Sequence, residues 1–191
     1  MKRLMFVLVC LASLIPAQDA QNRTGLHVMV DINDHWFVPV WSISNFKQHS
    51  SDNSNIFTGI GYRGKTWWIQ GLAQHQWNRS NGLWSADARF RRQLGRVSVY
   101  IESSVILTPK KTFYEFVIVE ERLWKRLALR QETENVHRPG KDLIAIGGGL
   151  AYSLGKWRGF DVATALVYRA SPMGRDELRA YLNITRRIKI H

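Results

Sequence analysis

Apolar and polar residues alternate with a period of two in many separate runs of this chain. The clearest runs lie between residues 142 and 190, where compact turns separate three such segments. Successive side chains of a β-strand point to opposite faces, so each run predicts a strand with one apolar and one polar face. In one run, large apolar residues alternate with small or charged ones: Phe160, Val162, Leu166 and Tyr168 against Asp161, Ala163, Ala165 and Arg169. The pattern predicts an all-β protein.

Alternation of this kind extends over most of the chain. One long first strand is expected over 26–43, because the apolar residues from Leu26 to Val40 keep a single phase that only Asp34 interrupts. Polar residues or Gly and Pro separate the later runs, as turns and loops require. The expected strands after the first cover 56–63, 66–77, 83–91, 96–107, 112–120, 123–132 and three segments between 142 and 190.

The segment 112–133 allows a second interpretation. Phe113 to Val119 favours a strand, but Glu121 to Gln131 is rich in helix-forming residues. Two strands with a turn near Glu121 make short turns alternate with longer loops, which is typical of outer-membrane barrels, whereas a helix or one continuous strand would reduce the count to about eight or nine. We predict a single antiparallel up-and-down transmembrane β-barrel of about ten strands, with both ends of its chain on the same side.

The first 20 residues have the features of a secretory signal peptide. Lys2 and Arg3 precede an apolar run that Pro16 ends, and Ala20 is a suitable cleavage position. The run is shorter than the roughly 20 apolar residues that a membrane-spanning helix needs. Cys10, the only cysteine in the sequence, lies inside this segment, so the exported chain would use no disulfide. We predict a signal peptide over 1–20 and one barrel domain over 21–191.

Alternation leaves open which face of the barrel is the inside. A soluble lipocalin-like barrel has an apolar interior, whereas a membrane barrel carries its apolar face outside. The expected first strand lacks the Gly-x-Trp motif of lipocalin-like proteins. Tryptophans near strand ends favour the membrane barrel, because aromatic side chains form girdles at membrane interfaces, although ordinary β-propensity also enriches them in strands. The expected girdle comprises Trp67, Trp77, Trp84 and Trp157.

The last expected strand, Leu178 to Ile190, keeps Ile184 and Ile188 in one apolar phase. This strand resembles the terminal targeting strand of bacterial outer-membrane β-barrel proteins. The signal peptide and the alternating loop lengths are further features that such proteins share. Those proteins usually end in an aromatic residue, whereas this sequence ends in His191. The resemblance is to an architecture that covers the whole chain, and it implies localisation in a bacterial outer membrane.

With the apolar face toward lipid, the polar face would fill the lumen. Buried carboxylates there should find arginine partners, because unpaired buried charge is costly. The expected lumen charge network comprises Asp87, Arg89, Arg91, Glu102, Glu115, Arg126, Arg130, Asp161, Arg169 and Arg179. It would either plug the barrel or, through surplus arginine, favour anions in a narrow passage. Small residues would leave one inner wall thin, with room for arginine side chains or a pocket: Gly147, Gly149, Ala151, Ala163 and Ala165.

The formal net charge of +12 favours acidic partners. For an exported protein these would be membrane lipids, including lipopolysaccharide phosphates, rather than nucleic acid. Catalytic and metal-binding motifs are absent, and Asp34 and His35 point to opposite faces of a strand, so we expect no catalytic residue and no cofactor. The predicted function is a structural or adhesive outer-membrane barrel or a narrow, anion-selective pore. Two alternatives are a secreted lipocalin-like barrel binding a small apolar ligand and a barrel enzyme acting on lipid or peptide.

Overall fold

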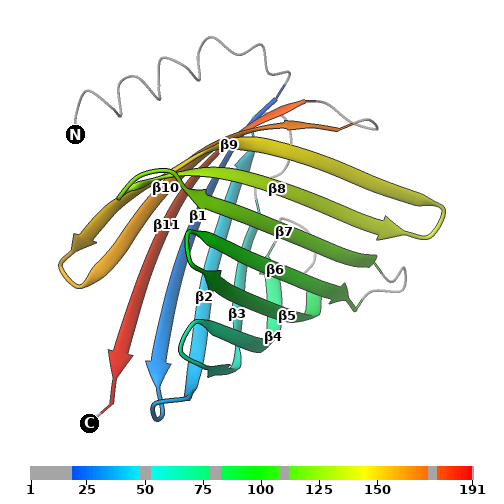
Figure 1. Cartoon of the computed structure of the whole chain (residues 1–191). Helices are drawn as coiled ribbons and strands as arrows, with labels where there is room; N and C mark the ends of the chain where they lie inside the picture. Colours follow the sequence, from blue (N-terminus) through cyan, green and yellow to red (C-terminus); the bar gives the residue numbers. More distant parts are fainter. Residues whose placement is uncertain (1–18, 48–52, 78–82, 108–111, 172–175, 191) are drawn as a thin grey trace.

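The computed structural model describes residues 19–47, 53–77, 83–107, 112–171 and 176–190. This part of the chain forms one closed barrel of eleven strands (Figure 1). In chain order the strands are β1 (Asp19–Asp31), β2 (Trp36–Lys47), β3 (Asn53–Arg63), β4 (Trp67–Trp77), β5 (Leu83–Leu94), β6 (Val97–Ile106), β7 (Thr112–Arg122), β8 (Leu127–Arg138), β9 (Lys141–Trp157), β10 (Phe160–Ala170) and β11 (Glu177–Lys189). None of the described residues belongs to a helix with the length and apolarity needed to cross a membrane.

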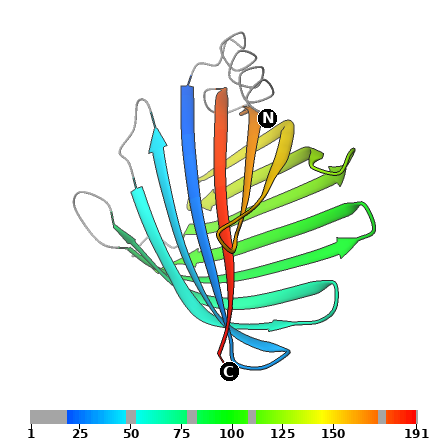
Figure 2. The ribbon, with the colours of Figure 1, turned by 90° about the vertical axis from the view of Figure 1, so that its left-hand side faces the viewer.

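Neighbouring strands are antiparallel except where the barrel closes, between β1 and β11. Figure 2 shows these two strands side by side, in blue and red. A meander reverses direction at every turn, so an odd number of strands leaves the first and last pointing the same way. The parallel pairing runs from Asp19 opposite Glu177 to Asp31 opposite Lys189. The prediction that both ends of the barrel chain lie on one side is therefore wrong, because β1 begins at one end of the barrel and β11 finishes at the other.

The expected long first strand is two strands, β1 and β2, joined by a tight turn over 32–35. The Asn33 side chain closes this turn, because its Oδ1 accepts hydrogen bonds from the backbone N–H groups of His35 at 2.9 Å and Trp36 at 2.8 Å. An Asn side chain that bonds to the backbone two residues on is a common turn former. The turn accounts for the eleventh strand.

The segment 112–133 forms two strands, as predicted, and the helical alternative is wrong. The chain turns at 123–126, where the backbone N–H groups of Leu123 and Trp124 both donate to the carbonyl of Leu127 at 3.0 Å. β8 then continues to Arg138, beyond the expected end at residue 132. Most of the expected loop 133–141 is thus strand, and Gly140, with φ of 78°, supplies the left-handed residue of the turn into β9.

The two ends of the barrel differ in the lengths of their connections. At the end where β11 finishes, which we call the short-turn end, the connections cover 32–35, 64–66, 95–96, 123–126 and 158–159. At the opposite long-loop end they cover 48–52, 78–82, 107–111, 139–140 and 171–176. Apart from 139–140, the long-loop connections have five or six residues. Longer loops on one side are the asymmetry that the sequence pattern predicts.

Only small apolar clusters occupy the interior of the described barrel. Ile43, Phe57 and Leu72 form one on β2, β3 and β4, with Trp41 packed against it. Ala165, Val167 and Tyr181 form the other on β10 and β11, with Ala151 beside it. Among the described residues, sixteen buried side chains are polar or charged and only nine, Pro39 included, are apolar. The interior of this barrel is therefore mainly polar.

Gly149 on β9 sits where the strand packs too closely against β10 for a side chain. A Cβ atom there would overlap the backbone of Leu166 and Val167, whereas one on neighbouring Gly148 would meet nothing within 4 Å. We expect Gly149→Ala to lower the free energy of unfolding by about 1–3 kcal/mol, the usual effect of overpacking. Gly148→Ala is the matched control and should change it by less than about 0.5 kcal/mol. Urea unfolding of the folded barrel would show both values, and equal effects would contradict the close packing.

Candidate functional site in the barrel interior

The first group of interior charges surrounds Arg89 on β5. Arg89 Nε donates to Asp87 Oδ1 at 2.7 Å, and its Nη2 lies 3.6 Å from Glu102 Oε1 on β6. The two carboxylates also accept hydrogen bonds from the hydroxyls of Ser104 at 2.5 Å and Tyr100 at 2.8 Å. The Arg89 side chain has no solvent exposure. We call these five residues the Arg89 cluster.

Arg89 also bridges the charged and the aromatic parts of the interior. Its guanidinium carbon lies 4.0 Å from the ring centre of Phe57 and 4.6 Å from that of Trp41. Trp41 also contacts His27, whose ring is stacked on the indole at 3.6 Å between centroids. Stacking of cations and flat rings is favourable where water is excluded. The contacts hold β1, β2, β3 and β5 together from inside.

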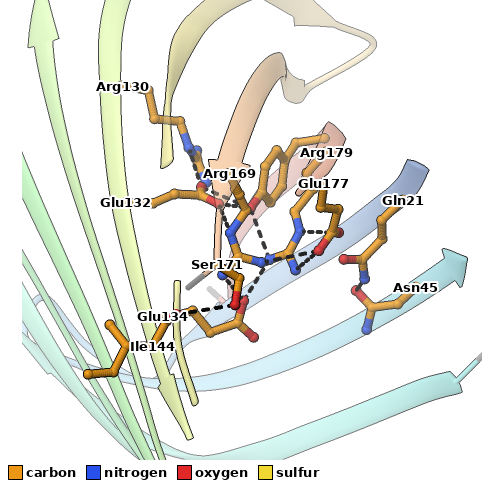
Figure 3. Close-up of polar contacts among 11 residues, drawn as sticks. Gln21, Asn45, Arg130, Glu132, Glu134, Ile144, Arg169, Ser171, Glu177 and Arg179 are labelled. Atoms are coloured by element: carbon orange, nitrogen blue, oxygen red, sulfur yellow. Dashed lines mark hydrogen bonds and ion pairs between the residues drawn. The ribbon is translucent and has the colours of Figure 1, made fainter. Parts of the chain in front are cut away.

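A larger group of charges centres on Glu132 of β8 (Figure 3). Arg130 Nε and Arg169 Nε both lie 3.2 Å from its carboxylate, and the Tyr181 hydroxyl donates to it at 2.7 Å. Arg169 further pairs with Glu134, which also receives Arg179 Nη1 at 3.0 Å. This Glu132 cluster is completed by the partners at its edges, Glu120 and Glu177. The cluster ties β7, β8, β10 and β11 together inside the barrel.

A third, smaller group lies at the short-turn end. Asp31, the last residue of β1, pairs with Arg63 of β3 and with Arg187 of β11, whose Nε lies 2.6 Å from its Oδ2. The Arg187 side chain is 46% exposed, so this pair is partly solvated. Partly solvated pairs contribute little to stability, about 0–1 kcal/mol.

Arg23 and Arg91, which both line the central cavity, lack a carboxylate partner among the described residues. Arg23 on β1 forms no ion pair there, and its guanidinium carbon lies 5.3 Å from the ring centre of Phe116. Arg91 on β5 donates from Nε to the Ser98 hydroxyl at 3.2 Å and has no acidic partner within ion-pair distance in the described part of the chain. An arginine without a carboxylate keeps its charge and its hydrogen-bond donors available. These two positions contribute unpaired positive charge to the lumen.

Three cavities follow one another along the barrel. A loop-end cavity of about 180 Å³ adjoins a central cavity of about 390 Å³, and the two share Arg23, Ile43 and Glu102 in their lining. A turn-end cavity of about 290 Å³ adjoins the central one, and both are lined by Arg91 and Ser98. The interior is therefore not filled by side chains from end to end. Both unpaired arginines lie at boundaries between cavities.

The turn-end cavity has a strongly basic lining. Its charged residues are Arg91, Arg96, Glu120, Arg122, Lys125 and Arg126. Five of these six are cations, and Glu120 already pairs with Arg130. A concave surface lined by charges of one sign concentrates the field and attracts ions of the opposite sign. The short-turn mouth of the lumen is thus suited to attracting anions.

The structure places the residues of the expected charge network in three different environments. Asp87, Arg89, Glu102, Arg130, Arg169 and Arg179 are buried inside the barrel. Arg91, Arg126 and Asp161 are exposed residues that line the cavities near the short-turn end. Glu115 differs from its expected place, because its phase in β7 is that of the outward-facing Phe113, and its carboxylate lies 3.7 Å from His137 Nε2 on β8.

Sequence reasoning missed Arg23, Glu132, Glu134 and Tyr181. Arg23 precedes residue 26, where the first strand was expected to begin, although it keeps the phase of His27 on the inner face. Glu132 and Glu134 share the phase of Arg130. This phase could have identified Glu132 within the expected strand, and Glu134 had the strand been extended beyond residue 132. Tyr181 lies among the small and polar residues of the inner phase of β11, where nothing in the sequence marks its role.

The small residues of the inner wall have two different surroundings. The space over Gly147 is filled by Arg169 and Val167 of the neighbouring strand and by Glu132. Gly149 lies against the backbone of β10, and Ala165 is buried in an apolar cluster. Ala151 and Ala163, by contrast, line the turn-end cavity. The arginine that uses the room on this wall thus comes from the next strand, not from across the lumen.

Large apolar side chains are concentrated on the outer face of the described barrel. Exposed residues of this kind include Leu26, Ile60, Ile69, Ile101, Val105, Leu129, Ile146 and Leu182. Of the expected girdle, Trp67 and Trp157 are exposed at the short-turn end and Trp84 at the long-loop end. The side chain of Trp77 lies outside the part of the structure that is described. The barrel thus has an apolar outside and a polar inside.

Comparison with protein-family models and with curated proteins finds no match for this chain. Among the described residues, no group of three or more His, Cys, Asp or Glu side chains is arranged to hold a metal ion. The interpretation of the interior therefore depends on its own geometry and charge.

Proposed function

We propose that this protein is a small outer-membrane β-barrel whose lumen forms a narrow passage that favours anions. The observation that supports a location in a membrane is the polarity of the barrel, which is the reverse of that of a soluble barrel. Apolar side chains cover the outside, whereas ion-pair clusters and polar cavities occupy the inside. A lipid-facing apolar band around a polar interior is typical of transmembrane barrels. In this proposal the partner of the outer face is lipid, including lipopolysaccharide at the membrane surface.

The charge inside the lumen supports a preference for anions. The buried carboxylates of the Arg89 and Glu132 clusters are neutralised by arginine, whereas Arg23 and Arg91 have no acidic partner among the described residues. The basic turn-end cavity adds positive charge at one mouth. Rings of Arg and Lys are the means by which pores favour anions. The ion-pair clusters keep the rest of the lumen narrow.

The structure favours this function over a lipocalin-like carrier. A carrier of small apolar ligands needs a large apolar interior. The interior apolar clusters of the described barrel are small, and the buried charges separate them. The odd strand number departs from the even number usual in bacterial single-chain barrels, and the parallel pairing of β1 and β11 accommodates it.

A planar-bilayer experiment tests the passage. The chain without residues 1–20 is refolded in detergent and added to a bilayer with a salt gradient. It should give small conductance steps, and the sign of the reversal potential should be that of an anion-selective channel. The double variant Arg23→Gln with Arg91→Gln removes the two unpaired charges and should move the anion-to-cation ratio several-fold toward one.

Arg158→Gln is the control for this experiment, because Arg158 is an exposed residue of the turn between β9 and β10. Arg158→Gln removes one positive charge, as each substitution of the double variant does, and it should leave the anion-to-cation ratio unchanged. Solubility of the folded protein without detergent would overturn the membrane barrel. Insertion without conductance, or with a cation preference, would overturn the passage.

A further inference from the structure

We infer that the central cavity is a binding site for a small aromatic carboxylate, and that this site lies in the path of the proposed passage. The inference deepens the proposed function and depends on it for the route by which the ligand arrives. The site itself is defined by the residues that line the cavity.

The central cavity has the size of a small-ligand site. Its volume of about 390 Å³ falls in the lower part of the range of roughly 300–1,000 Å³ that such sites occupy. It is bounded by the loop-end cavity on one side and by the turn-end cavity on the other, so it can be reached from either direction. A simple inorganic anion would leave most of this space unoccupied.

The walls of the cavity contain flat apolar groups. Trp68, Tyr100 and Phe116 all line it, and Trp68 lies edge-on to Tyr100 with 6.1 Å between ring centroids. His27 lines it too, with one face of its ring stacked on Trp41. Met29 and Ile118 add further apolar surface. Rings arranged in this way favour a planar, apolar ligand body over a hydrated one.

Three aromatic residues of the lining, Trp41, Tyr100 and Tyr181, already have partners for their polar ends. The Tyr100 hydroxyl donates to Glu102 at 2.8 Å, and the Trp41 indole N–H donates to Gln70 at 2.9 Å. The Tyr181 hydroxyl likewise donates to Glu132. These three rings can therefore contact an apolar ligand body without leaving their own polar ends unsatisfied.

Arg23 and Arg91, which form no ion pair with any described residue, mark the ends of this cavity. Arg23 stands at its boundary with the loop-end cavity and Arg91 at its boundary with the turn-end cavity. A guanidinium binds a carboxylate through two parallel hydrogen bonds, and this geometry makes arginine the usual partner of carboxylate ligands. A carboxylate at Arg23 would place an attached ring beside Phe116, which that arginine already contacts.

Isothermal titration calorimetry of the refolded barrel in detergent tests the site without any need for conductance. The probes are benzoate, acetate, which has the charge without the ring, and benzyl alcohol, which has the ring without the charge. We expect benzoate to bind at least tenfold more tightly than either, because only benzoate uses both the rings and the arginine.

The variant Arg23→Gln should weaken benzoate binding by about tenfold or more, the loss expected for a charged hydrogen bond. Arg23→Lys keeps the charge but not the paired donors, so its affinity for benzoate should lie between that of the unchanged protein and that of Arg23→Gln. Arg91→Gln provides an independent test at the other end of the cavity and should also weaken binding. Arg187→Gln is the control, because Arg187 lies outside the three cavities and shares Asp31 with Arg63, and it should leave the affinity unchanged.

Benzoate that binds no more tightly than acetate would overturn the aromatic site. Unchanged affinity in both Arg23→Gln and Arg91→Gln would do the same. These outcomes are distinct from failure of the proposed function, because a barrel can conduct anions without retaining benzoate. Conversely, benzoate binding by a barrel that fails to insert into membranes would support the site and contradict the passage.

Discussion

Replacing Arg89 by methionine should lower the free energy of unfolding by about 3–5 kcal/mol, the usual effect of leaving buried charges without their partner. Arg89 is the cation of two buried carboxylates, Asp87 and Glu102, and neither has another ion-pair partner among the described residues. Methionine has a similar length and fills the space beside Phe57, so the loss would report charge and not a cavity. Urea titration of the refolded barrel, followed by the shift of folded and unfolded bands on a gel, measures it.

A second set of variants separates charge from packing at Arg89. Adding Asp87→Asn and Glu102→Gln to Arg89→Met removes the two orphaned charges and should recover most of the lost stability. Arg187→Met is the control, because its side chain is 46% exposed and its partner Asp31 keeps Arg63, so the expected loss is about 0–1 kcal/mol. A loss below about 1 kcal/mol for Arg89→Met itself would mean that water solvates Asp87 and Glu102.

Much of the barrel could be predicted from the sequence, because the two-residue period of a strand is a property of the backbone itself. The turn at 32–35 was missed for a related reason. Its four residues are an even number, so Val30 before it and Trp36 after it keep the same phase, and the alternation passes through the turn unchanged. The end of β8 was missed because both of its faces become polar, with Glu134 inside and Asn135 outside.

The interior could be predicted only in part. The phase of the strands identifies Asp87, Arg89 and Glu102 as residues of the polar face, but β7 is apolar on both faces, and phase alone misplaced Glu115. Pairing is a further step, because it depends on which strands meet when the barrel closes. Asp31 and Arg187 are 156 residues apart and become neighbours only through the parallel pairing of β1 with β11.

The same limitation applies to the two unpaired arginines. No local feature distinguishes Arg23 from Arg179, since both occupy the inner phase of strands at the barrel closure. Arg179 meets Glu134, which is 45 residues away in the sequence, whereas Arg23 forms no ion pair with any described residue. Surplus charge in a lumen is therefore a property of the register across the whole barrel, which a single sequence does not reveal.

An arginine placed in the middle of the outer face should be strongly destabilising if lipid surrounds the barrel. Ile101 lies near the middle of β6, and Ile188 lies one residue before the end of β11; both isoleucines are 38% exposed. Ile101→Arg should lower the free energy of unfolding in lipid vesicles by about 2–4 kcal/mol, because the charge would lie near the bilayer midplane. Ile188→Arg, near the interface, should lower it by only about 0–1 kcal/mol.

The comparison of these two variants separates a membrane barrel from a soluble one. In water, an arginine on an exposed strand surface changes stability by less than about 0.5 kcal/mol, whatever its distance from the end of the strand. A dependence on depth arises only when a low-dielectric layer surrounds the middle of the barrel. Equal and small effects at Ile101 and Ile188 would therefore mean that water contacts the apolar outer face, and the polar lumen would then need an explanation other than a passage through lipid.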